Sequence, residues 1–189
     1  MGTVLHDPNE LPANLPAPVD DGGASHLAGR RWPALALPAT DGSSINLSGL
    51  RGRTVVYVYP RTGRPGAALP TGWDAIPGAR GCTPQSCGFR DHFAELRSLG
   101  VARLFGLSAQ SREDQREVVE RLHLPFALLS DAQLELKRAL NLPIFEVDGM
   151  VLLKRLTVVV DDGIISKVFY PVFPPDRSAA EVIAWLGAG

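Results

Sequence analysis

The chain has 189 residues, of which 45% are hydrophobic and 21% are charged, the composition of a globular domain with enough apolar residues for a sizeable core. Lysine and arginine number 19 and aspartate and glutamate 20, so a net charge of -1 argues against nucleic acid or an acidic membrane surface as a partner. No apolar run is long enough to span a membrane, and the segment from Met1 to Leu15 lacks a secretory-signal pattern, so we expect a cytoplasmic protein.

Residues 1–28 are predicted to form an N-terminal extension, and residues 29–189 the folded domain. The extension holds four prolines and an Asp-Asp-Gly-Gly run but has no sustained hydrophobic periodicity. We expect it to wrap over the surface of the domain or to remain mobile.

The rest of the chain alternates between strand and helix patterns. Capping-box patterns begin at Ser111, Ser130 and Ser178, and Asp161-Asp162-Gly163 predicts a tight hairpin turn. This order predicts an α/β protein with a thioredoxin-like fold, in which helices flank a central mixed sheet. In chain order we expect strands at 35–37, 54–59, 103–108, 126–129, 156–160 and 164–170, and helices at 84–99, 111–122, 130–141 and 178–186.

The segment 61–81 is predicted to be a long loop, because it holds five glycines and three prolines. It follows the predicted strand at 54–59, and open α/β sheets place their functional sites at the carboxyl ends of such strands. Loops of this length inside a compact domain are usually functional or disordered. Trp73 and Ile76 could pack against the domain, so we expect the loop to be at least partly ordered.

The two cysteines, Cys82 and Cys87, are too few to staple a domain of this size, and a reducing cytosol disfavours a permanent disulfide. A reactive or redox role is therefore favoured. Thr83-Pro84 is typical of a helix start, which places Cys82 at the amino end of a helix. Unpaired N–H groups and the helix dipole stabilise a thiolate at that position.

The spacing of the two cysteines restricts how they can pair. Residues five apart in an α-helix have Cα atoms about 8–9 Å apart. A disulfide needs a Cα separation below roughly 7 Å, so the bond can form only if the first helical turn unwinds.

Several motifs, taken together and in this order, resemble the Q-type peroxiredoxins, also called bacterioferritin comigratory proteins. The resemblance covers about residues 29–189. The motifs are Leu37-Pro38-x-x-Asp41-Gly42, Leu47-Ser48-x-Leu50-Arg51-Gly52, Tyr59-Pro60, Gly81-Cys82-Thr83-x-x-x-Cys87-x-Phe89-Arg90-Asp91, Phe105-Gly106-Leu107-Ser108, Leu128-Leu129-Ser130-Asp131 and Lys154-Arg155-Leu156-Thr157-Val158-Val159-Val160-Asp161.

The resemblance implies a thiol-dependent peroxidase that reduces hydrogen peroxide and organic hydroperoxides. Cys82 matches the peroxidatic cysteine, Cys87 a resolving cysteine found in some members, and Arg155 the active-site arginine. The cycle would pass through a sulfenic acid and a Cys82–Cys87 disulfide, which thioredoxin or a glutaredoxin-type donor would reduce. No metal or organic cofactor is implied, and we expect a monomer or weak dimer.

The chain departs from the family motif Pro-x-x-x-Thr-x-x-Cys. Pro60 lies 22 positions before Cys82 where the motif has seven, so the chain carries an insertion of 15 residues. Ala79 stands where the motif has threonine. The long loop could bring in Thr62 or Thr71 instead, and Thr83 is a neighbour. Thr62 follows Pro60 most closely, and we name it as the candidate.

Other functions compete with the peroxidase. A thioredoxin-like disulfide oxidoreductase usually carries Cys-x-x-Cys, whereas this spacing is Cys-x-x-x-x-Cys. A non-catalytic redox sensor on the same scaffold is consistent with the missing threonine and the insertion. Two idle buried thiols are the simplest alternative. Zinc binding by Cys82, Cys87 and His92 does not fit the helical spacing.

Overall fold

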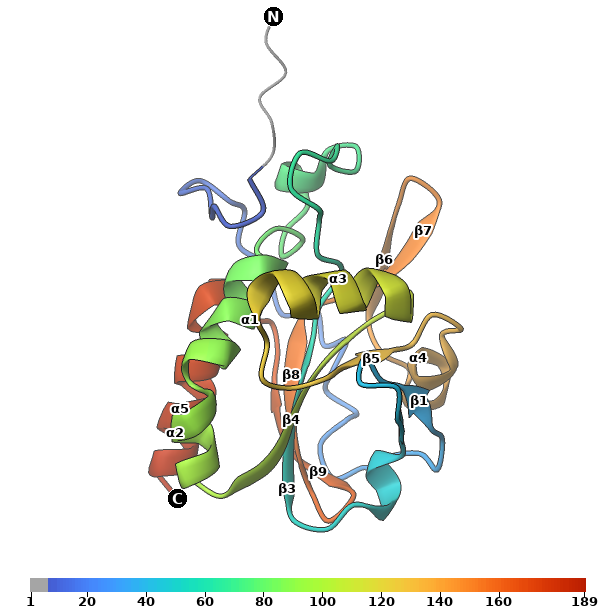
Figure 1. Cartoon of the computed structure of the whole chain (residues 1–189), viewed down its shortest axis with the longest axis vertical. Helices are drawn as coiled ribbons and strands as arrows, with labels where there is room; N and C mark the ends of the chain where they lie inside the picture. Colours follow the sequence, from blue (N-terminus) through green and yellow to red (C-terminus); the bar gives the residue numbers. More distant parts are fainter. Residues whose placement is uncertain (1–6) are drawn as a thin grey trace, which may run out of the picture.

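The computed structural model describes residues 7–189 and has a five-stranded sheet in the order β5-β4-β3-β8-β9 (Figure 1). β3, β4 and β5 are parallel, while β8 pairs antiparallel with β3 and β9 antiparallel with β8. This arrangement confirms the predicted mixed sheet. The strands are β1 Leu37–Pro38, β2 Ser44–Ile45, β3 Arg53–Val58, β4 Val101–Ser108, β5 Leu128–Ser130, β6 Ile144–Val147, β7 Met150–Leu153, β8 Leu156–Asp161 and β9 Ile164–Phe169. The helices are α1 Cys82–Asp91, α2 Phe93–Ser98, α3 Arg112–Leu122, α4 Glu135–Leu140 and α5 Ser178–Gly187, with short 3-10 turns η1 Leu47–Gly49, η2 Trp73–Ala75 and η3 Pro175–Arg177.

The central strand β3 is buried on both faces, and its side chains alternate between two cores. Val55 and Tyr57 pack into the cluster that includes apolar residues of α1, α2, α3 and α5. Val56 and Val58 pack into the second cluster, with residues of α4 and of the N-terminal segment. Gly106 of β4 faces the Tyr57 ring, and a Cβ there would lie 2.6 Å from that ring. The sheet therefore positions its central strand through close packing on both sides.

The predicted helix at 84–99 is wrong in two respects. It begins earlier, at Cys82, with Gly81 at φ 103° as its N-cap in place of Thr83. It also breaks at His92, which leaves helical geometry and separates α1 from α2. Glycine tolerates the left-handed backbone that this tight entry requires, so the helix can begin before the hydroxyl residue. The break has no signal in the sequence, since apolar residues continue across it.

The capping predictions have mixed outcomes. The Ser111 side chain accepts a hydrogen bond from the Asp114 N–H, as predicted. Ser130 does not cap α4, because the buried Asp131 carboxylate accepts from the Leu136 and Lys137 N–H groups instead. Ser178 is the first residue of α5 rather than its cap, and the N-cap residue makes no side-chain bond to the helix.

The second half of the chain contains two β-hairpins. The predicted turn is confirmed, with Asp162 and Gly163 both at positive φ between β8 and β9. The hairpin of β6 and β7, which turns at Asp148-Gly149, was not predicted. Its apolar face packs against the 61–81 loop, where Trp73 and Ala79 form a small cluster with Val147 and Leu152. The loop is thus ordered, as Trp73 and Ile76 indicated.

The N-terminal extension wraps over the domain from Asp7 onward, and its first six residues lie outside the described part of the chain. Ala24 and Leu27 are buried in the core. Arg31 forms an antiparallel bridge with Ile164 of β9. The 61–81 loop, the start of the described chain and the β6–β7 hairpin gather at the carboxyl end of β3 (Figure 1). Within residues 7–189, none of the helices has the length and apolar character needed to cross a membrane.

Candidate active site

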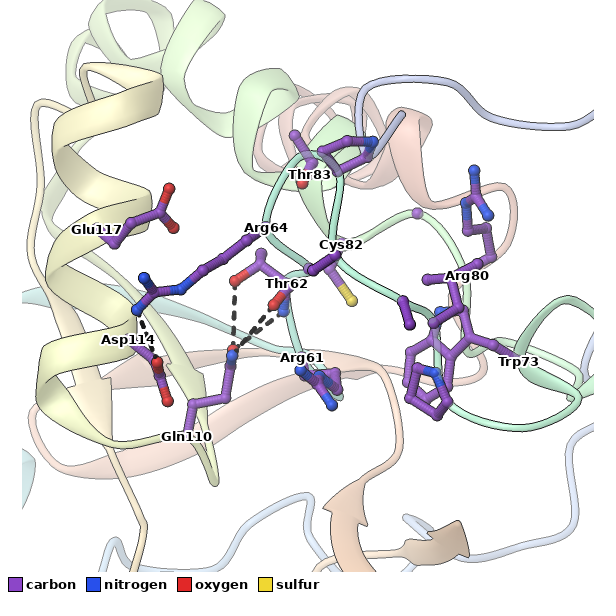
Figure 2. Close-up of a pocket in the computed structure, with 17 residues that line it drawn as sticks. Arg61, Thr62, Arg64, Trp73, Arg80, Cys82, Thr83, Gln110, Asp114 and Glu117 are labelled. Carbon is purple, nitrogen blue, oxygen red and sulfur yellow. Dashed lines mark hydrogen bonds and ion pairs between the residues drawn. The ribbon is translucent and has the colours of Figure 1, made fainter. Parts of the chain in front are cut away.

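Cys82, the first residue of α1, lies beside a pocket of about 110 Å³ at the carboxyl end of β3 (Figure 2). The 61–81 loop supplies most of the pocket wall, and α3 supplies the opposite side through Asp114 and Glu117. The thiol is 4% exposed and free of any disulfide. Its Sγ lies 3.7 Å from the carbonyl oxygen of Ala79. The sulfur is therefore shielded from bulk solvent and borders this pocket.

Arg155 lies next to this sulfur, on the short connection between β7 and β8. Its Nη2 lies 3.2 Å from Cys82 Sγ, and 3.2 Å from each of the carbonyl oxygens of Gly78, Ala79 and Arg80. The side chain is 3% exposed. The same guanidinium thus contacts the turn before Cys82 and donates toward the sulfur.

The Arg155 charge lacks an acidic partner in the part of the chain that the structure describes. Among residues 7–189, no carboxylate forms an ion pair with Arg155. A buried cation is stable only if an anion or several dipoles compensate it. Three carbonyls and an amide oxygen supply dipoles, and the Cys82 sulfur is the group nearby that can supply a full negative charge. The arrangement therefore places a fixed positive charge beside Cys82 Sγ.

Gln85, one helical turn after Cys82, positions the arginine. Its Oε1 accepts a hydrogen bond from Arg155 Nη1. Its Nε2 donates to Ser178 Oγ at 3.3 Å, and that hydroxyl is 3.2 Å from Thr157 Oγ1. Because Ser178 fixes the amide nitrogen, the amide oxygen faces Arg155. Sequence reasoning missed Gln85, although its place three residues after Cys82 puts both on one helix face.

Thr62 lies on the wall of the same pocket, and is 3% exposed. Gln110, which follows β4, holds it through three contacts: Thr62 N–H to Gln110 Oε1 at 3.0 Å, Thr62 Oγ1 to Oε1 at 3.3 Å, and Gln110 Nε2 to the Thr62 carbonyl at 3.2 Å. Of the three threonines considered from the sequence, Thr62 and Thr83 line the pocket and Thr71 does not. Gln110 was missed, because nothing in its local sequence marks it.

Cys87 lies further along α1 and is half-buried. It borders a separate surface hollow of about 380 Å³, which Thr83, Pro84 and Asn9 also line. Burial raises the pKa of the Cys87 thiol, and the nearby Arg90 opposes this only in part. The structure thus places both cysteines on one helix, but Cys82 borders the pocket of about 110 Å³ and Cys87 borders a different hollow.

Comparison with known proteins identifies the relatives of this chain. The Redoxin family model matches residues 27–183. The chloroplastic peroxiredoxin Q of Oryza sativa subsp. japonica is 27% identical over 159 residues, which are 84% of this chain and 65% of that protein. The chloroplastic peroxiredoxin Q of Suaeda salsa is 28% identical over 181 residues, covering 95% of this chain and 73% of that protein. This chain therefore spans slightly less than two thirds of the length of the rice relative.

The chain is also similar to a solved structure from this group of proteins. The crystal structure of peroxidoxin BcpB from Mycobacterium tuberculosis has a TM-score of 0.66 and 26% sequence identity, and the match covers 86% of this chain and 97% of that one. The predicted thioredoxin-like fold is confirmed by this likeness and by the mixed sheet flanked by helices.

Proposed function

This chain belongs to the Redoxin family, among the Q-type peroxiredoxins, and from that premise we propose that it is a thiol peroxidase with Cys82 as its nucleophile. The observation that carries the proposal is the buried Arg155 guanidinium, which lies 3.2 Å from Cys82 Sγ and has no carboxylate partner within residues 7–189. A fixed cation at this distance supports both a thiolate and the negative charge that develops as a peroxide bond breaks.

In the first step, the Cys82 thiolate attacks the terminal oxygen of a hydroperoxide. An S–O bond forms, the O–O bond breaks, and the alkoxide or hydroxide that leaves takes up a proton. Sulfur is oxidised to a sulfenic acid and the peroxide is reduced to an alcohol or water. Arg155 stabilises the developing charge. The Thr62 hydroxyl donates to Gln110 Oε1, and its oxygen is proposed to accept a hydrogen bond from the peroxide O–H in place of the threonine that Ala79 replaces.

In the second step, the Cys87 thiolate attacks the sulfenic sulfur of Cys82. A disulfide forms, and the hydroxide that leaves is released as water. Both residues belong to α1 in the described conformation, and its first turn must unwind for the sulfurs to meet.

The Cys82–Cys87 disulfide then returns to two thiols by exchange with an external dithiol. A thioredoxin or glutaredoxin-type protein is the donor that we propose. The half-buried Cys87, beside a surface hollow, is accessible to such a donor. We further propose a monomer or weak dimer that works in a reducing compartment such as the cytoplasm.

A thiol count tests the proposal. Fully reduced wild type, Cys82→Ser and Cys87→Ser are each treated with one equivalent of hydrogen peroxide and quenched over seconds, and their intact masses are measured. We expect wild type to lose both thiols, Cys87→Ser to accumulate one oxygen on Cys82, and Cys82→Ser to remain unchanged. If all three react no faster than a free thiol, the peroxidase is excluded, and a binding or sensing role on the same scaffold would replace it.

A further inference from the structure

We infer that Arg80 holds the N-terminal segment Asp7–Leu11 over the first turn of α1, and that this latch controls how quickly oxidised Cys82 reaches Cys87. We call Asp7–Leu11 the latch segment. The inference rests on the proposed function, because it concerns the second step of that reaction. It assigns a positioning role to Arg80 and a role to an extension that lies outside the peroxidase domain predicted from the sequence.

Arg80 joins three parts of the chain two residues before Cys82. Its Nη1 donates to the Asp74 carboxylate of the inserted loop at 2.8 Å. Its Nη2 lies 3.2 Å from the Asp7 carbonyl oxygen and 3.4 Å from that of Glu10. The Arg80 side chain is 9% exposed, and Asp74 is 51% exposed. A mostly buried guanidinium that bridges one carboxylate and two carbonyls fixes the geometry of all three segments.

The latch segment also packs directly against the start of the helix. A Cβ on Gly81, the N-cap, would lie 2.9 Å from Leu11 Cδ1 and 2.3 Å from Pro175 Cγ. Leu11 of the latch segment and Pro175 of η3 therefore both fill the space on the Cβ side of Gly81. Pro8 reaches the rim of the Cys82 pocket, and Asn9 borders the hollow of Cys87. The segment thus covers the residues that must move for the disulfide to form.

Unwinding the first turn of α1 has to displace these contacts. Leu11 and Pro175 fill the space beside Gly81, so their packing opposes movement of residues Gly81 to Pro84 out of their helical positions. Residue Arg80 moves with them, so its bonds to Asp74 and to the latch segment are lost at the same time. These contacts stabilise the closed state, in which the first turn of α1 is helical. The population of the open state, in which that turn is unwound, falls correspondingly.

A rarer open state lengthens the life of the Cys82 sulfenic acid. During that time a second hydroperoxide can react with it: a further S–O bond forms, the O–O bond breaks, sulfur is oxidised to sulfinic acid, and the peroxide is reduced to an alcohol or water. Resolution by Cys87 and this second oxidation compete for one intermediate. A weaker latch must therefore speed disulfide formation and protect Cys82 from overoxidation.

The test uses the full chain with Arg80→Met, which keeps the apolar stem but removes the charge and the three bonds. Arg53→Met is the matched control, because Arg53 forms a comparable pair with Asp161 at 2.7 Å at the far end of β3. Disulfide formation is followed by rapid quench and intact mass after one equivalent of hydrogen peroxide. Sulfinic acid is counted at rising peroxide with a dithiol reductant present.

We expect Arg80→Met to form the disulfide about tenfold faster than wild type and to need about tenfold more peroxide to reach half overoxidation, the effect of losing charge-assisted hydrogen bonds. Arg53→Met should match wild type in both. The first step is measured separately in the Cys87→Ser background, so that a change in peroxide reactivity is not mistaken for a change in opening. A merely structural role for Arg80 would slow resolution or raise overoxidation.

The outcomes separate this inference from the function on which it depends. If wild-type Cys82 does not react with peroxide, the peroxidase itself fails. If wild type forms the disulfide and Arg80→Met forms it no faster, the latch is excluded. Should Arg80→Met fail to fold by circular dichroism, Leu11→Ala decides in its place, since Leu11 touches Gly81 without any bond to Arg80. Faster resolution in Leu11→Ala supports the latch, and an unchanged rate rejects it.

Discussion

At the residue scale, the chemistry that we propose for the site depends on how one guanidinium divides its hydrogen bonds between its neighbours. Arg155 Nη1 donates a hydrogen bond to Gln85 Oε1. Its Nη2 donates toward Cys82 Sγ and toward the carbonyl oxygens of the turn before Cys82. A planar fork can do both at once, whereas an ammonium group is a point charge that can face only one of these partners well. Arginine is therefore required for geometry as well as for charge.

Replacing Arg155 with methionine should lower the second-order rate constant for hydrogen peroxide about 100-fold, because one preorganised charged donor to the transition state is lost. Arg155→Lys should fall between this variant and wild type. The rate constants are measured by stopped flow on reduced protein. A variant within about twofold of wild type would show that the Arg155 charge does not act on the reaction.

Thr62 carries the hydroxyl that we place on the peroxide. Thr62→Val should lower the same rate constant about tenfold, the effect of one lost hydrogen bond, while Thr62→Ser should keep most of it. Thr71→Val is the matched control, because Thr71 belongs to the same loop but does not line the pocket. Equal loss in Thr62→Ser and Thr62→Val would assign the effect to packing instead.

Cys87 should titrate above the ordinary cysteine range of about 8.5, because burial raises its pKa. In reduced Cys82→Ser, where Cys87 is the remaining thiol, alkylation should accelerate continuously between about pH 7 and pH 8.5, since the thiolate is still the minor form there. A plateau below about pH 8 would contradict the raised pKa. The rate for a short cysteine peptide under the same conditions gives the reference.

At the element scale, the 61–81 loop packs against the β6–β7 hairpin. Trp73 is 4% exposed and packs with residues of the β6–β7 hairpin, which the sequence did not predict. The Thr71 N–H also donates to the Asp148 carboxylate at the hairpin turn, at 2.8 Å. These contacts explain why a segment rich in glycine and proline is ordered and forms a wall of the Cys82 pocket.

If this wall limits access to Cys82, then Trp73→Ala should widen the pocket of about 110 Å³. The ratio of kcat/KM for cumene hydroperoxide to that for hydrogen peroxide should rise about tenfold, because pockets discriminate weakly but measurably by size. Trp185→Ala serves as the control, since Trp185 belongs to α5, packs against Phe169 and does not line the pocket. An unchanged ratio in Trp73→Ala would exclude a role of the wall in substrate choice.

Local patterns predicted most elements but not the details around the site. Hydrophobic runs gave the strands of the central sheet, and the Ser111 cap gave the start of α3 correctly. The start of α1 was placed two residues late, because the N-cap is a left-handed glycine and hydroxyl residues are the usual signal. Gln85 and Gln110 act through residues distant in the chain, so only the fold could bring them to Arg155 and Thr62.

At the scale of the whole molecule, the N-terminal extension connects the core with the site. Leu27 is buried in the core, and Asp7 and Glu10 bind Arg80 beside Cys82. Between these points, the Asp21 carboxylate accepts from Lys154 Nζ at 2.7 Å and from the Tyr170 hydroxyl at 2.7 Å. Because Lys154 directly precedes Arg155, the hydrogen bond at Asp21, which we call the Asp21 tether, joins the extension to the connection that carries Arg155.

This tether makes one contribution to stability depend on pH. The hydrogen bond from Lys154, and then that from Tyr170, hold the pKa of the Asp21 carboxyl well below its usual value of about 3.9. A group whose pKa is lowered by folding stabilises the folded state above its unfolded pKa, and this stabilisation is lost as the pH falls through the folded pKa. Asp21→Asn should therefore have a lower Tm than wild type near pH 6, and this difference in Tm should shrink as the pH falls below about 4.

Thermal unfolding at a series of pH values measures the gap in Tm, with Asp20→Asn, which keeps the Asp21 tether, as the control. A gap that stays constant down to about pH 3 would show that the Asp21 charge does not hold the extension in place.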